Sequence, residues 1–188
     1  MVSLMKYKLF IFALLLFITS VEIIPQHRSI IFADTSWAAI KAKALKENKP
    51  IFMDAFASWC GPCKWLAANV FTNDTVADYY NDTFINAHFD MEKGEGLELQ
   101  KLYNVYVYPT LLFINANGEL IHRGVGSMPV ADFVSLGKLA VNPEKNLASF
   151  NKRFASGTRD ADFMYNYLDI IRYDDAFCKK ITTEYLGI

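Results

Sequence analysis

The 188-residue sequence predicts an α/β fold, in which a mixed central sheet carries helices on both faces and a C-terminal helical extension follows. Three observations support this class. Short apolar segments alternate with helix-like segments over residues 29–141, and a turn-rich segment at 115–118 separates two of the strand-like segments. From residue 142 onward only helical patterns occur. We therefore expect one α/β domain at 29–141 and a helical extension at 142–188.

The domain is expected to begin with a strand, a helix and a second strand. Residues 29–33 predict the first strand, and the Asp34-Thr35-Ser36 segment offers side chains that cap a helix over 37–47. Residues 50–57 predict a short buried strand that contains a single acid, Asp54. The buried side of the helix is expected to carry Trp37, Ile40, Ala44 and Leu45.

The middle of the domain is predicted to continue with a helix over 64–80, broken near 72–75 by polar residues. Residues 83–90 alternate as a third strand, and residues 97–103 form a short helix. In the 64–80 segment the side chains expected to point inward are Trp65, Leu66, Val70 and Phe71, followed by Val76, Tyr79 and Tyr80.

Two antiparallel strands and a helix complete the predicted domain. Residues 110–115 and 120–124 flank the turn Asn115-Ala116-Asn117-Gly118, which has the composition of a hairpin. Residues 129–139 predict the last helix of the domain. The extension is expected to contain three helices without a recognisable motif, at 143–154, 160–173 and 174–186.

The composition excludes several functional classes. The formal net charge is −1, so no nucleic-acid partner is expected, and the aromatic content of 15% favours a substantial core. Only three cysteines occur, and the three histidines are scattered, so neither a disulfide-stapled scaffold nor a metal site is expected.

The N-terminus resembles a targeting segment. Lys6 and Lys8 precede an apolar run over residues 9–18, which is short for a membrane-spanning helix. We interpret residues 1–20 as a signal peptide, or as an N-terminal anchor if it is not cleaved, and residues 21–28 as a linker. The protein is accordingly expected to be exported to a periplasmic or other extracytoplasmic space, with membrane contact only through this segment.

Cys60 and Cys63 form the motif that carries chemistry. Two cysteines two residues apart can close a disulfide ring and open it again during thiol–disulfide exchange. At a helix N-terminus the first thiolate is stabilised by unpaired backbone N–H groups and the helix dipole. Pro62 suits the first turn of such a helix. We expect Cys60 to be the exposed nucleophile and Cys63 the recessed resolving thiol.

The chain resembles the thioredoxin superfamily over roughly residues 30–140. Its segment Trp59-Cys60-Gly61-Pro62-Cys63-Lys64 matches the thioredoxin active-site motif residue for residue. Asp54 lies six residues before Cys60, where thioredoxins carry a buried acid, and Tyr108-Pro109-Thr110 resembles the cis-proline loop of the family. The resemblance implies the thioredoxin fold and a Cys60–Cys63 redox disulfide.

The same resemblance implies roles for residues around the motif. Asp54 would be a buried acid of raised pKa that takes a proton from Cys63. The Tyr108–Pro109 peptide bond would be cis. Substrate contacts would come from Trp59, Gly61, Pro62, Tyr108, Pro109, Thr110, Gly124 and Val125.

His88 stands where a thioredoxin-like strand can carry a lysine, and we expect it to face solvent. Cys178 is expected to be a free, partly buried thiol.

These observations predict a thiol–disulfide oxidoreductase that reduces disulfides in protein substrates. A Gly-Pro dipeptide between the cysteines resembles the reducing members of the family. We expect this protein to need recharging by a membrane electron donor, and no organic cofactor, because the cysteines carry the electrons. Two alternatives remain at this stage. The protein could be a disulfide oxidase or isomerase, or a thioredoxin-fold binding or chaperone module that works through its C-terminal helices.

Overall fold

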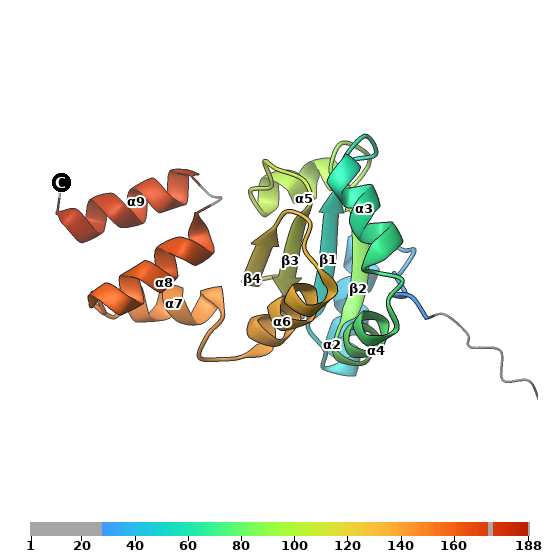
Figure 1. Ribbon diagram of the computed structural model, residues 1–188, viewed down its shortest axis with the longest axis horizontal. Coiled ribbons are helices and arrows are strands. Elements are labelled where there is room, and N and C mark those ends of the chain that lie inside the picture. Colours follow the sequence, from blue (N-terminus) through green and yellow to red (C-terminus); the bar gives the residue numbers. More distant parts are fainter. Residues whose placement is uncertain (1–27, 173–174, 188) are drawn as a thin grey trace, which may run out of the picture.

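The computed structural model describes residues 28–172 and 175–187. The predicted targeting segment and nearly all of the predicted linker lie outside these residues. Four strands form one sheet in the order β2-β1-β3-β4, with helices on both faces, and three further helices continue beyond β4 (Figure 1). The predicted fold class, with its mixed sheet and helical extension, is confirmed.

The sheet is mixed because one of its three strand pairs is parallel and the other two are antiparallel. Strand β1 (Ile51–Phe56) runs parallel to β2 (Ile85–Asp90) and antiparallel to β3 (Thr110–Ile114). Strand β4 (Leu120–Val125) pairs with β3 through the predicted hairpin, where Gly118 adopts a positive φ of 93°. Strands β1 and β3 lie in the middle of the sheet, and their side chains are buried on both faces. Their sequences are accordingly nearly continuous apolar runs.

One face of the sheet is covered by α2 (Trp37–Glu47) and α5 (Gly96–Leu102). Ser36 caps α2, since its hydroxyl accepts the Ala39 N–H. Trp37, Ile40 and Ala44 are buried as predicted, but Leu45 is 59% exposed. The spacing of the three buried residues defines a narrow apolar stripe, and Leu45 lies about 100° around the helix from Ala44.

The opposite face carries α3 (Gly61–Asn69), α4 (Asp74–Thr83) and α6 (Val130–Val141). The predicted break near residues 72–75 is confirmed, because Asn73 caps α4 through its side-chain oxygen. Aromatic rings dominate this core: Tyr80 stacks on Phe133 with ring centroids 4.5 Å apart, and its hydroxyl donates to the Phe133 carbonyl. Trp65, predicted to point inward, is instead 45% exposed.

The predicted strand at residues 29–33 was wrong. Only a single parallel bridge, from Phe32 to Asn86, joins this segment to the sheet. The Ile30 N–H donates to the Phe71 carbonyl, and the Ile31 N–H donates to the Asn81 side chain. Because these two backbone N–H groups donate to Phe71 and Asn81, they are not available for strand pairing with β2.

The C-terminal helices have a core of their own. They are α7 (Leu147–Ala155), α8 (Ala161–Ile171) and α9 (Asp175–Leu186), and their buried residues include Phe150, Phe163 and Tyr167. Helix α7 packs against β4, the edge strand of the sheet (Figure 1). At this junction His122 Nδ1 accepts the Leu147 N–H at 3.2 Å, and burial lowers the pKa of His122 to about 4. The histidine is therefore neutral at physiological pH and can accept that bond.

None of the helices within residues 28–172 and 175–187 is both long and apolar enough to cross a membrane.

Candidate active site

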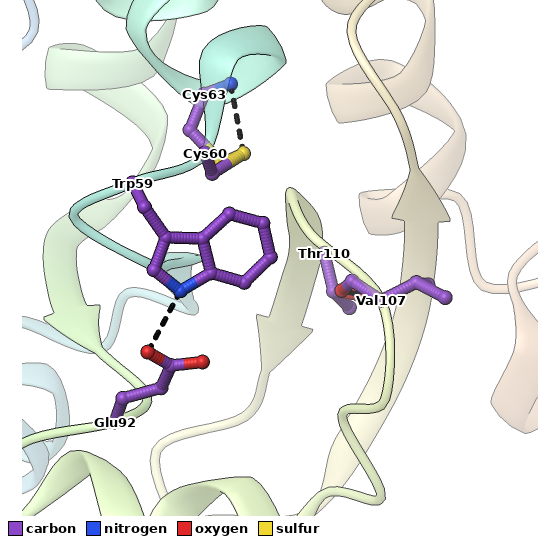
Figure 2. The surroundings of a disulfide bond; sticks show 6 residues. All are labelled: Trp59, Cys60, Cys63, Glu92, Val107 and Thr110. Atoms are coloured by element: carbon purple, nitrogen blue, oxygen red, sulfur yellow. Dashed lines mark hydrogen bonds between the residues drawn. A yellow bond between two sulfur atoms is a disulfide. The ribbon is translucent and has the colours of Figure 1, made fainter.

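The two motif cysteines form a disulfide at the N-terminus of α3 (Figure 2). Cys60 is the N-cap residue, and its Sγ accepts the backbone N–H of Cys63 at 3.1 Å. Pro62 occupies the first turn, where a residue without an N–H group costs no hydrogen bond. When the disulfide is reduced, this arrangement directs an N–H group and the positive end of the helix dipole at Cys60 Sγ, so it stabilises a thiolate there.

The expectation that Cys60 would be exposed was wrong for the disulfide form. Cys60 is only 2% exposed, and Cys63 is also buried. The pair packs against Ala57, and the partly buried rings of Phe56 and Tyr108 lie against it. The disulfide therefore belongs to a small apolar cluster of its own.

Asp54 lies inside β1, six residues before Cys60, and its side chain is buried. Burial raises its pKa from an ordinary value of 3.8 to about 7. Among the described residues its Oδ1 finds no hydrogen-bonding partner. A buried carboxyl group with one unpartnered oxygen and a pKa near neutrality is suited to accept and return a proton at physiological pH.

Trp59 directly precedes Cys60 and is held by the loop that follows β2, which lies at the same end of the sheet as the loop that follows β1. Its indole Nε1 donates to Glu92 at 2.8 Å (Figure 2). The neighbouring Lys93 donates to the Ser58 hydroxyl at 3.1 Å and pairs with Asp90 at 2.9 Å. The indole is 66% exposed, yet these contacts fix its orientation. The segment from Met91 to Glu95 thus positions the residues that precede Cys60.

Gly96 fixes this segment against β2, and we expect Gly96→Ala to loosen it. A Cβ at Gly96 would lie 2.0 Å from the backbone oxygen of Asp90, so the backbone itself would have to move. The free energy of unfolding should fall by about 2–3 kcal/mol. Urea unfolding measures this. Gly94→Ala is the matched control, because a Cβ at Gly94 would meet no atom within 4 Å. The only expected cost of that substitution is about 1 kcal/mol for an alanine at the positive φ of 49°. Equal losses in both variants would contradict the steric account.

The predicted cis peptide bond between Tyr108 and Pro109 is confirmed. The Tyr108 ring meets Trp59 edge to face at 5.9 Å, and its hydroxyl accepts a hydrogen bond from Gln100. Thr110 donates its hydroxyl to the Val107 carbonyl (Figure 2). The Gly126 N–H donates to the Pro109 carbonyl at 2.9 Å. The loop before β3 and the end of β4 are therefore joined beside the disulfide.

Gly124 and Val125 lie in β4 rather than in a loop, and Val125 pairs with Thr110. A Cβ on Gly124 would come within 2.5 Å of Leu136, so the glycine lets α6 pack closely on the sheet. Its substrate contact therefore stays a prediction, and a packing role accounts for the glycine.

His88 is exposed, as expected, but its ring is stacked between Phe32 and Phe56 with centroid distances of 5.0 and 5.1 Å. Partial burial lowers the pKa of His88, and the charge of Asp34 opposes that shift. His88 is the register partner of Asp54 in the parallel pair β1–β2. Burial alone accounts for the raised pKa of Asp54.

Glu92 is a site residue that the sequence did not reveal. It lies in a polar loop 33 residues from its partner Trp59, and no spacing rule links the two positions. Cys178 is a free, partly buried thiol on α9, as predicted. No cluster of three metal-ligating side chains occurs among residues 28–172 and 175–187.

Comparison with known proteins finds a family described as thioredoxin-like, whose model matches residues 33–116. The thioredoxin of Acidithiobacillus ferridurans is 32% identical over 97 residues, which cover 52% of this chain and 84% of that protein. The M-type chloroplastic thioredoxin of Spinacia oleracea is 32% identical over 96 residues, covering 51% of this chain. This match spans 48% of the spinach protein, about half its length.

A solved structure is also similar. The solution structure of a Bacteroides thetaiotaomicron protein, described as a candidate disulphide isomerase, is 46% identical and superimposes with a TM-score of 0.57. That match covers 62% of this chain and 97% of the other. Together with the mixed sheet, the Cys60–Cys63 disulfide at the N-terminus of α3 and the cis Tyr108–Pro109 bond, these matches show that the chain belongs to the thioredoxin superfamily of thiol–disulfide oxidoreductases.

Proposed function

We propose that this protein reduces disulfide bonds in other proteins through its Cys60–Cys63 pair. The observation that carries the proposal is the position of Cys60 at the N-cap of α3, where Cys63 donates its N–H to Cys60 Sγ. A helix N-terminus stabilises a thiolate, so it makes Cys60 the attacking sulfur of the pair. The direction of electron transfer is supported by the Gly-Pro dipeptide between the cysteines, which resembles the reducing members of the family.

The exchange runs in two balanced steps. The Cys60 thiolate attacks one sulfur of the substrate disulfide, that bond breaks, and the leaving substrate thiolate takes up a proton. Cys63 then loses its proton and attacks Cys60 Sγ, which releases the second substrate thiol. The substrate gains two electrons and two protons, and the enzyme is left with its own disulfide.

Asp54 is proposed to receive the Cys63 proton. The support for this role is its burial and its pKa of about 7, which lets the carboxyl group exist in both protonation states near neutral pH. Trp59, Gly61, Pro62, Tyr108, Pro109 and Thr110 are proposed to contact the substrate chain. The two-electron chemistry resides in the cysteines, so no organic cofactor is required.

Recharging the dithiol form needs an external dithiol donor. The apolar run at residues 9–18 supports export to an extracytoplasmic space, so we propose a membrane-bound donor with a redox-active dithiol. Residues 1–20 would then act as a cleaved signal or as an anchor.

Disulfide isomerisation is the second candidate, because the Bacteroides protein of 46% identity is described as a candidate disulphide isomerase. The two functions can be separated with a protein whose disulfides have been scrambled. A reductase, supplied in its dithiol form in stoichiometric excess, converts this substrate to free thiols. An isomerase restores native disulfides with little net release of thiol.

The test incubates the reduced protein with both a native disulfide-bonded substrate and the scrambled one, and counts free thiols and native disulfides. The proposal expects thiol release in proportion to enzyme consumed. Recovery of native pairing without thiol release would support isomerisation. A separate incubation mixes the disulfide form of the protein with a reduced substrate. Oxidation of that substrate at a faster rate than reduction or isomerisation would identify an oxidase.

A further inference from the structure

A cavity of about 420 Å³ lies where the C-terminal helices meet the thioredoxin-like domain, beside β4 (Figure 1). Its walls come from both parts of the chain. Strand β4 and the loop that leads to the cis-proline bond form one wall, and α7, α8 and α9 form the other. The volume falls within the range of about 300–1,000 Å³ that is typical of small-molecule sites, which often lie between two packed units.

Part of the lining of this cavity is apolar. Leu147 and Ile171 are buried, while Leu120 and Phe177 are partly buried against the core of the C-terminal helices. Leu120 also packs against the core on the α2 side of the sheet. The four side chains come from β4, α7, α8 and α9, so elements of both parts hold them in place. Together they offer an apolar surface to a hydrocarbon body.

The polar part of the lining contains two cations, Arg123 on β4 and Lys180 on α9. No aspartate or glutamate is among the described residues that line the cavity. Arg123 donates to the Tyr103 carbonyl at 2.7 Å, which fixes its side chain in the wall. A guanidinium group has five N–H donors, so it can hold this carbonyl and bind a further acceptor at the same time.

Asn151 adds a neutral donor to the same lining. Its side-chain oxygen accepts the Tyr167 hydroxyl at 2.6 Å, so the amide N–H groups are the part of this side chain that can bind a ligand. The polar groups are thus mainly donors and cations, which complement an acceptor with negative charge.

We propose that this cavity binds a free amphiphilic carboxylate of the size of a medium-chain fatty acid. The carboxylate is held by Arg123 and Lys180, and the hydrocarbon body lies against the apolar side chains. A neutral head group gains less from the two cations, and a cationic one is repelled. The cavity shares no lining residue with the cluster around the disulfide, so the proposal is independent of the reductase function.

The experiment titrates the full chain with decanoate, octanoate and decanol and follows binding by isothermal titration calorimetry. Decanoate should bind saturably and about tenfold more tightly than decanol, since hydrogen bonds to charged groups are the stronger ones. Octanoate should bind about tenfold more weakly than decanoate, because each buried methylene group strengthens binding by roughly fourfold.

Two lysine variants locate the site. Lys180→Glu should weaken decanoate binding by about tenfold or more, because repulsion replaces attraction, and should leave the affinity for decanol unchanged. Lys179→Glu is the matched control, since Lys179 is exposed on the same helix but does not line the cavity. It changes the net charge equally and should bind decanoate as wild type does. The apolar run at residues 9–18 is present in every variant, so any probe that it binds is common to all.

A loss of decanoate affinity confined to Lys180→Glu, with decanol affinity intact, supports the proposal. Absence of saturable decanoate binding, or equal affinities of wild type for decanoate and decanol, would overturn it. So would an unchanged decanoate affinity in Lys180→Glu, or the same loss in both lysine variants. The reductase function stands or fails separately, through thiol release by the Cys60–Cys63 pair.

Discussion

Cys60→Ser is expected to lower the turnover of disulfide substrates by about a thousandfold or more, since the nucleophile is lost. Cys63→Ser is expected to behave differently. Its Cys60 thiol still attacks, but no second thiol releases the substrate, so a covalent adduct should accumulate. Non-reducing electrophoresis and mass determination after mixing with a disulfide-bonded protein would detect this adduct, with a mass equal to the sum of the two chains.

Cys178→Ser is the matched control for both variants. Cys178 lies on α9 and packs with the core of the C-terminal helices, so turnover should stay at the wild-type rate. An adduct in Cys60→Ser, with none in Cys63→Ser, would reverse the assignment of the two thiols. Loss of turnover in Cys178→Ser would show that the redox chemistry involves a third sulfur.

Asp54→Asn is expected to stabilise the disulfide form at alkaline pH. The pKa of Asp54 is raised from 3.8 to about 7 by burial, so between these values the folded state binds more protons than the unfolded state. Wild-type stability therefore falls as pH rises through this window, and the loss is complete above pH 7. Each tenfold change in proton affinity corresponds to about 1.4 kcal/mol, so the loss approaches about 4 kcal/mol.

Urea unfolding of the disulfide form at pH 4 and pH 8 measures this effect. Asp54→Asn should exceed wild type by about 2–4 kcal/mol at pH 8, with a much smaller difference at pH 4. Asp82→Asn, at an exposed position on α4, should show no such pH-dependent gain. If the free energies of unfolding of Asp54→Asn and wild type differ by the same amount at pH 4 and pH 8, Asp54 is not buried as a carboxylate.

The same variant separates a proton-transfer role from a purely structural one. An asparagine cannot take the Cys63 proton, so release of the mixed disulfide near pH 7 should slow by about a hundredfold while the variant is more stable. Stopped-flow measurement of the second thiol released would follow this step. A stabilised variant with wild-type release kinetics would assign Asp54 to structure alone.

Much of this architecture could be read from the sequence because its local signals agree. The apolar runs of β1 and β3, the Asn73 cap that separates α3 from α4, and the Asn115–Gly118 turn each determine structure over a few residues. The motif cysteines and the cis Tyr108–Pro109 bond also followed from short segments that match the family.

The features that the sequence did not reveal depend on contacts between distant segments. The burial of Cys60 comes partly from the Tyr108 ring, and the orientation of Trp59 comes from Glu92. Residues 29–33 have strand-like composition, but Phe71 and Asn81 take backbone bonds that a ladder would need. Trp65 is apolar and was expected inside, yet Leu66 and Val70 already fill the buried side of α3.

The reduction potential of the Cys60–Cys63 couple tests the central claim most directly. The protein would be equilibrated in thiol–disulfide buffers of known ratio, with tryptophan fluorescence reporting the fraction reduced, since Trp59 directly precedes Cys60 (Figure 2). A potential near that of thioredoxin, about −270 mV, is the result that a disulfide reductase predicts. A potential near about −120 mV, typical of a strong oxidant, would contradict the reductase assignment and make the protein a donor of disulfides.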